Sequence, residues 1–217
     1  DEILKNGLVP RGKKNRRSNW DHTVKSRAGY VYLTSSYGFY FAHSAVKDRD
    51  AGKGVVIELV LTEEDETKLY PDEDFIAQAQ NRGEPGGDLL TKTKQVDLTE
   101  FKQSWPLSLK HLGNVCHKGV IPASRIKRVA IIDTRARMDL VMSYGDNCVS
   151  ILAFTVMRPT YEGFINWLFG DKKLLPVGVG GMDLETLERE GGLWAEKAAH
   201  VRKQSADRHG IEVRKVR

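Results

Sequence analysis

The chain has 217 residues, of which 40% are hydrophobic and 29% are charged. This balance supports a folded domain with a core and excludes a chain that is disordered throughout. No apolar run approaches the ~18 residues that a membrane-spanning helix needs. The two cysteines, Cys116 and Cys148, are too few for a disulfide framework or a cysteine-rich zinc site and read as buried thiols. We therefore expect a cytoplasmic protein that has no membrane partner and binds no metal.

The first 135 residues read as a mixed α+β core. Residues 1–8 look like the last turns of a helix that Gly7 ends. Segments rich in β-branched and aromatic residues predict strands over 29–35, 55–61, 117–122 and 127–133. Helical spacing predicts helices over 37–47, within 71–80, and from Asp97 or Thr99 to about Leu112. The acidic composition of 62–67 predicts a loop, and the Gly, Pro and Asn content of 81–95 predicts another.

Residues 136–217 read as a C-terminal extension of a strand and helices. Residues 161–169 form an amphipathic pattern, and 183–208 have the composition of a long charged helix. The fold class that we expect is α+β, with a core over 1–135 and a partly helical annex over 136–217.

No Walker loop, GxGxxG, GxSxG or HExxH motif is present. A series of short motifs instead carries a resemblance. They are the segment ILKNGL at 3–8, VYLTS at 31–35, a helix with Ala42 and Ala45, and VVIEL at 55–59. Their order resembles the NAD-binding core of the small ADP-ribosyltransferase superfamily over residues 1–133. Within that superfamily the segments resemble the rifampin ADP-ribosyltransferases, the DarT toxins and the tRNA 2′-phosphotransferases. The resemblance implies a small split β-sheet core. The superfamily's first motif, a His or Arg, would lie upstream of Asp1.

Within this resemblance, Tyr32 matches the aromatic residue of a "Y-[LI]-T" strand, and Thr34 closes that motif. Such a ring would stack on nicotinamide and keep the ribose C1′ exposed. Tyr30 lies on the same face of the strand and is the main alternative. A tyrosine that is simply packed in a strand is the other interpretation.

The acidic cluster Asp72-Glu73-Asp74 occupies the place of the catalytic acid in the rifampin enzymes. Departure of nicotinamide builds positive charge on the ribose, and a fixed carboxylate stabilises that charge or takes a proton from the acceptor. We expect Glu73 to be the catalytic residue, before Asp72 and Asp74, and to face Tyr32 across the ribose. A solvated acidic turn is the alternative.

Residues 113–122 resemble the late strand and turn of DarT and its phosphotransferase relatives. DarT has a catalytic Glu on that strand, whereas this chain has Gly113, Asn114 and His117 there and no Glu. Either the acid lies at 72–74, or the domain is weak or inactive. No "G-H-S" segment of the tRNA phosphotransferases is present.

A basic loop lies where the superfamily lines the NAD phosphates and the acceptor entrance. In it we expect Arg11 and Arg16 to contact NAD, and Lys13, Lys14, Arg17 and Trp20 to contact nucleic acid. A net charge of +5 tolerates such a partner but does not require it. A solvated loop is the alternative.

The resulting hypothesis is an NAD-dependent ADP-ribosyltransferase that modifies RNA or DNA. NAD is its substrate, and the protein would act as a toxin or phage-related effector with an antitoxin or inhibitor protein as a further partner. The alternatives are transfer to a small molecule or a protein, and an inactive nucleic-acid-binding module of the same fold.

Overall fold

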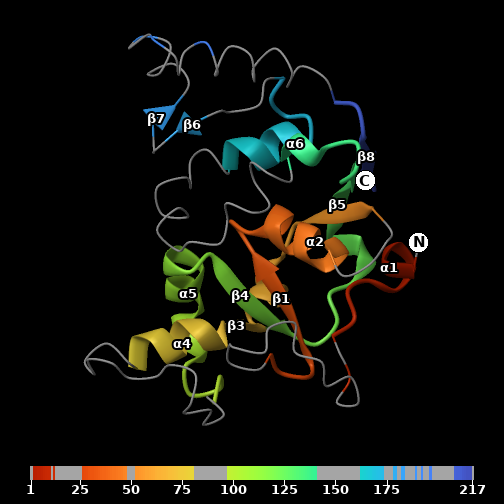
Figure 1. The fold of residues 1–217 in the computed structure, drawn as a ribbon. Coiled ribbons are helices and arrows are strands. Elements are labelled where there is room, and N and C mark those ends of the chain that lie inside the picture. The colour runs from red at the N-terminus through yellow and green to blue at the C-terminus, as the bar shows by residue number, and fades with distance from the viewer. Residues whose placement is uncertain are drawn as a thin grey trace. The chain divides into compact units, whose positions relative to one another are not determined.

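The structure is a computed structural model. It describes residues 2–10, 12, 26–47, 52–80, 97–140, 162–173, 178–179, 182–183, 189, 192, 196 and 208–216. The chain is mixed α+β (Figure 1), and these described residues form two three-stranded sheets and one two-stranded sheet. Its contacts divide it into two compact units, each built from separate segments. They are Asp1–Ser35 with Leu59–Ile126, and Ser36–Glu58 with Lys127–Arg217. The boundary expected near residue 135 stays a prediction.

The first unit contains an antiparallel sheet of three short strands in the order β1-β4-β3. The strands are β1 (Tyr30–Thr34), β3 (Leu69–Pro71) and β4 (Asn114–Lys118). In the register, Cys116 of the central strand lies opposite both Tyr32 and Tyr70. Since side chains alternate along a strand, these three residues share one face of the sheet.

Short helices precede, separate and follow these strands along the chain of the first unit. They are α1 (Glu2–Asn6), α3 (Glu63–Glu66), α4 (Glu73–Gln80), η1 (Lys102–Ser104), α5 (Trp105–His111) and η2 (Ala123–Arg125). The helix that we expected from residue 97 or 99 begins later. Asp97 accepts a hydrogen bond from the Thr99 backbone N–H at 2.9 Å and forms a local turn. The regular helix starts at Trp105, followed by Pro106 in its first turn, where a missing N–H does no harm.

The helix end predicted at Gly7 is confirmed. The Gly7 N–H donates to Ile3 O at 2.8 Å, and Leu8 then exchanges two backbone hydrogen bonds with Ile121. Gly7 has a φ of +77°, and a Cβ there would lie 2.1 Å from Ile121 O. Only glycine fits this position, because it tolerates both the left-handed backbone and the close approach.

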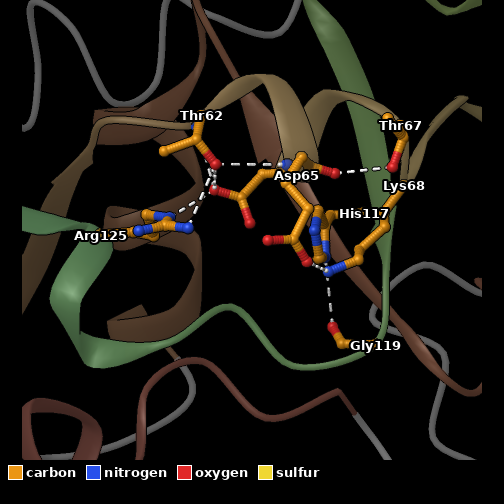
Figure 2. Close-up of polar contacts among 8 residues, drawn as sticks. Thr62, Asp65, Thr67, Lys68, His117, Gly119 and Arg125 are labelled. Atoms are coloured by element: carbon orange, nitrogen blue, oxygen red, sulfur yellow. Dashed lines mark hydrogen bonds and ion pairs between the residues drawn. The ribbon is translucent and has the colours of Figure 1, made fainter.

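The prediction that 62–67 form a loop is wrong, because a capping box makes α3 helical. The Asp65 backbone N–H donates to the Thr62 side chain, and the Asp65 carboxylate accepts from the Thr62 backbone N–H (Figure 2). Arg125 also donates to this carboxylate, which is only 2% exposed. Burial acts to raise the pKa of Asp65, but the hydrogen bonds from Thr62 and Arg125 outweigh it and hold the pKa at about 2.

The second unit contains a sheet in the order β2-β5-β8. Its strands are β2 (Lys53–Leu59), β5 (Ile126–Asp133) and β8 (Ile211–Lys215), and β5 pairs antiparallel with β8. Strand β8 was not predicted, because its sequence IEVRK is mostly charged. This unit also has α2 (Gly38–Lys47), α6 (Met138–Leu140) and the antiparallel pair of β6 (Gly178–Val179) and β7 (Met182–Asp183).

Aromatic residues form the core of the second unit. Phe39 of α2 packs edge-on against Phe164 with ring centres 5.0 Å apart, and both are fully buried with Trp167. Residues 162–168 are helical, which confirms the predicted amphipathic helix. Arg208 donates to the carbonyl oxygens of Trp167 and Leu168, and so it satisfies acceptors at the end of that helix. Most of the long helix expected over 183–208 lies outside the described residues. No helix within the described part of the chain is long and apolar enough to span a bilayer.

The buried Asp65–Arg125 pair gives the first prediction. Replacing Asp65→Ala leaves the Arg125 guanidinium without its carboxylate, so the free energy of unfolding should fall by about 3 kcal/mol. Urea titration at pH 7 measures this loss, with the exposed Glu66→Ala as the matched control. The double variant Asp65→Ala/Arg125→Met should recover part of the loss. A stability for Asp65→Ala equal to that of Glu66→Ala would contradict the structural role of the pair.

Candidate functional site

The candidate site lies on one face of the β1-β4-β3 sheet in the first unit. Tyr32 and Cys116 lie on that face, and the start of α4 follows directly after β3 in the chain. The buried residues Tyr70, Ile76, Leu98 and Cys116 form a cluster there, against which Tyr30 and Tyr32 pack. The junction between β3 and α4 therefore brings an acidic segment to an aromatic sheet face.

The centre of the site is a hydrogen bond between Tyr32 and Glu73. The Tyr32 hydroxyl donates to Glu73 Oε1 at 2.5 Å, and the same hydroxyl oxygen accepts the Arg27 backbone N–H at 2.8 Å. The Arg27 Nε lies 3.9 Å from Glu73 Oε1. Glu73 is only 2% exposed, so this carboxylate is removed from solvent, and the Tyr32 hydroxyl and the nearby Arg27 cation stabilise it.

Burial sets the protonation of both partners. It raises the pKa of Glu73, against the hydrogen bond from Tyr32 and the positive charge of Arg27, which lower it. Burial also raises the pKa of Tyr32, and the negative charge of Glu73 raises it further. Tyr32 therefore keeps its proton and acts as the donor of the pair.

Asp72 is a second buried carboxyl group, and it is 8% exposed. Burial raises its pKa to about 7, and the charge of Asp74 adds to the rise, while the hydrogen bond from the Asp74 backbone N–H opposes it. The Asp72 backbone is fixed as well, because its N–H donates to Ser108 Oγ at 3.0 Å. Ser108 in turn donates to the Asn114 carbonyl oxygen at 2.8 Å, which ties the start of α4 to α5 and β4.

The structure brings together the two residues at the head of the sequence hypothesis, Tyr32 and Glu73. They touch directly, however, whereas we expected a ribose to fit between them. A 2.5 Å hydrogen bond leaves no space for a sugar between those two oxygen atoms. A ligand would have to enter beside the pair and compete with the Tyr32 hydroxyl for the carboxylate.

The other predicted residues that the structure describes are Asp74, Tyr30 and Thr34. Asp74 is half-buried one residue further along α4. Tyr30 packs edge-on against Tyr70, with ring centres 5.4 Å apart. Thr34 lies at the other end of β1, where its hydroxyl donates to Gly113 O at 3.1 Å. The predicted residues of the basic loop lie outside the described residues; they are Arg11, Lys13, Lys14, Arg16, Arg17 and Trp20.

Sequence reasoning missed Arg27, which supplies both a backbone donor to Tyr32 and a side-chain charge near Glu73. Its position three residues before a strand carries no recognisable motif. Cys116 is confirmed as a buried thiol, and burial raises its pKa above its ordinary value, so the thiol stays protonated.

His117 lies on β4 next to Cys116, so its side chain belongs to the opposite face of the sheet. It is fully buried, and its Nδ1 lies 3.4 Å from Gly119 O (Figure 2). Burial lowers the pKa of His117, which favours the neutral ring. Among the described residues, no group of three or more His, Cys, Asp or Glu side chains is arranged to hold a metal ion.

The burial of Asp72 predicts a pH-dependent stability. Its folded pKa of about 7 exceeds the ordinary value of 3.8, so the folded chain holds a proton that the unfolded chain releases between these pH values. The wild-type protein therefore loses up to about 4 kcal/mol of unfolding free energy through this group as the pH rises from about 4 to about 7. Asp72→Asn keeps an acceptor for the Asp74 N–H and removes the charge. Its stability relative to wild type should rise across that window in urea titrations, whereas the exposed Glu66→Gln should show no such trend. A constant difference for Asp72→Asn would contradict this assignment.

The hydrogen bond between Tyr32 and Glu73 can be tested by removing the donor. Tyr32→Phe keeps the ring but leaves the buried carboxylate without its hydroxyl, at a cost of about 1–3 kcal/mol. The loss should be larger at pH 8 than at pH 5, because a protonated Glu73 needs the donor less. Tyr30→Phe, which removes a hydroxyl from the same strand face, is the matched control for unfolding measurements. Equal losses in the two variants at both pH values would speak against the pair.

Comparison with known proteins assigns no family to the chain, because no protein-family model and no curated protein sequence matches it. The function has therefore to be inferred from the chemistry of the Tyr32–Glu73 site.

Proposed function

We propose that the protein is an NAD-dependent ADP-ribosyltransferase in which Glu73 is the catalytic carboxylate and Tyr32 is the aromatic residue at the nicotinamide ribose. The observation that carries the proposal is the hydrogen bond between these two residues, which are 41 positions apart in the chain. The sequence motifs singled out both residues for one site. The buried carboxylate beside a tyrosine ring is the combination that the reaction needs.

The reaction breaks the bond between C1′ of the ribose and the nicotinamide nitrogen. Nicotinamide leaves with the bonding electron pair, which neutralises its ring charge, and positive charge develops on the ribose. An oxygen or nitrogen of the acceptor then bonds to C1′ and passes its proton to the ionised Glu73 carboxylate. An ionised Glu73 stabilises the developing charge more than it stabilises the bound substrate, because it is fixed and shielded from water. The Tyr32 ring supplies the face against which nicotinamide stacks.

The surroundings of Glu73 support this role. A buried carboxylate exerts a stronger field than one in water, and here it is held by a hydroxyl that a ribose hydroxyl can replace. Arg27 keeps a positive charge within 3.9 Å, which favours the ionised form. Asp72 is a second carboxyl group, next to Glu73 in the chain. Because burial raises its pKa to about 7, Asp72 is only partly ionised at neutral pH and adds little negative charge beside Glu73.

A nucleic acid is the acceptor that we propose. The chain carries 34 lysine and arginine residues against 29 aspartate and glutamate residues, and five of the cations lie between residues 11 and 17. This distribution suits a phosphate backbone. A role as a toxin or phage-related effector, with an antitoxin or inhibitor protein as partner, stays a prediction.

Nicotinamide release from NAD tests the catalytic assignment. Glu73→Gln and Tyr32→Ala should each lower turnover by at least roughly 10²-fold, because each removes one preorganised group. Asp65→Asn is the matched control, since it removes the charge of an equally buried carboxylate that Thr62 and Arg125 hold. Turnover should also rise with pH through the raised pKa of Glu73, because only the ionised form acts.

Two results would count against the proposal. Equal turnover in Glu73→Gln, Tyr32→Ala and Asp65→Asn would remove the site assignment. An absence of nicotinamide release from the wild-type chain, with intact binding of nucleic acid, would favour an inactive binding module instead. Labelled NAD decides the acceptor, because transfer of the ADP-ribose label to protein or to a small molecule alone would exclude RNA and DNA.

A further inference from the structure

Two lysines converge on one tyrosine ring next to the candidate site. The Lys102 Nζ lies 5.3 Å from the centre of the Tyr70 ring, and the Lys118 Nζ lies 6.0 Å from the same centre. Lys102 comes from η1 and Lys118 from the end of β4, so residues 16 positions apart place their ammonium groups against the same ring. Like charges repel each other, and the face of the tyrosine ring offsets part of that repulsion.

Among the residues that the structure describes, no carboxylate lies within ion-pair distance of Lys102 or Lys118. The ring engages only the charge of each ammonium, so its three N–H donors stay available for a further partner. Lys118 is exposed and Lys102 is half-buried, which leaves both within reach of solvent.

Lys118 lies on the same face of the sheet as Tyr32, which is hydrogen-bonded to Glu73. Lys118 is directly opposite Tyr30 in the register of β1 and β4, and Cys116, two residues earlier, is opposite Tyr32. Two residues along a strand cover about 7 Å. Tyr30, which is half-buried, is two residues from Tyr32 on β1 and packs edge-on against Tyr70.

We propose that Lys102 and Lys118 bind a backbone phosphate of single-stranded nucleic acid and thereby hold the acceptor beside Glu73. That the bound strand is the acceptor rests on the proposed ADP-ribosyl transfer. Two uncompensated ammonium groups provide the charge for a phosphodiester, and Tyr30 offers an aromatic surface for a neighbouring base. A phosphodiester keeps its charge at all physiological pH values, so binding should depend on salt more than on pH.

Fluorescence anisotropy with labelled single-stranded RNA and DNA of about 12 nucleotides tests this proposal without NAD present. The double variant Lys102→Gln/Lys118→Gln should bind at least about tenfold more weakly at low salt. The slope of log K against log salt should also shrink by about 0.7, because the contact to one phosphate of a single strand contributes about 0.7. Lys102→Arg/Lys118→Arg should retain both values, which shows that charge and not packing is measured.

The matched control is Lys5→Gln/Lys53→Gln, which removes the same charge at two exposed positions. Binding and salt slope equal to those of this control would overturn the phosphate site and leave the catalytic proposal standing. A rise in the KM for NAD with unchanged oligonucleotide binding would also overturn it, because the lysines would then hold the dinucleotide's own phosphates. A loss of oligonucleotide binding in the lysine variant supports the phosphate site, whatever the effect of Glu73→Gln on nicotinamide release. Unchanged nicotinamide release in Glu73→Gln would overturn only the catalytic proposal.

Discussion

The first unit depends on one constraint, which is the burial of the Glu73 carboxylate. A buried charge is costly unless hydrogen bonds and an opposite charge accompany it. Here the Tyr32 hydroxyl and the Arg27 side chain fill that role, and the Arg27 backbone N–H holds the hydroxyl in turn. A packing core alone would not need a charge at this position. A shielded carboxylate of this kind is the group that the proposed reaction would use.

Strand β4 organises this site because it is the central strand of its sheet. It pairs with β1 on one side and with β3 on the other, so a single register aligns Tyr32, Cys116 and Tyr70. Its alternation also separates two environments. Cys116 and Lys118 belong to the face with the acids and aromatic rings, whereas His117 belongs to the opposite face. A one-residue slip of β4 would exchange these faces.

The sequence allowed the strand containing Tyr32 and the acidic segment around Glu73 to be predicted, because both belong to short local motifs. The contact between them depends on the register of β4, which no local pattern reveals. The same limit explains why Arg27, Lys102 and Lys118 were missed, since each matters only through strand pairing or ring contacts. The wrong loop prediction at 62–67 has a local cause: four acidic residues suggested solvation, whereas Thr62 and Asp65 form a capping box.

Strand β8 completes the β2-β5-β8 sheet of the second unit. Residues 211–215 pair with 128–132 of β5 along their whole length. If they were deleted or displaced by a bulky fusion, the backbone N–H and C=O groups along that side of β5 would lose their partners. An uncovered strand edge of this kind is a template for intermolecular pairing. Versions of the chain that lack residues 211–215 should therefore self-associate. An affinity tag is better placed on an exposed loop than next to Val216.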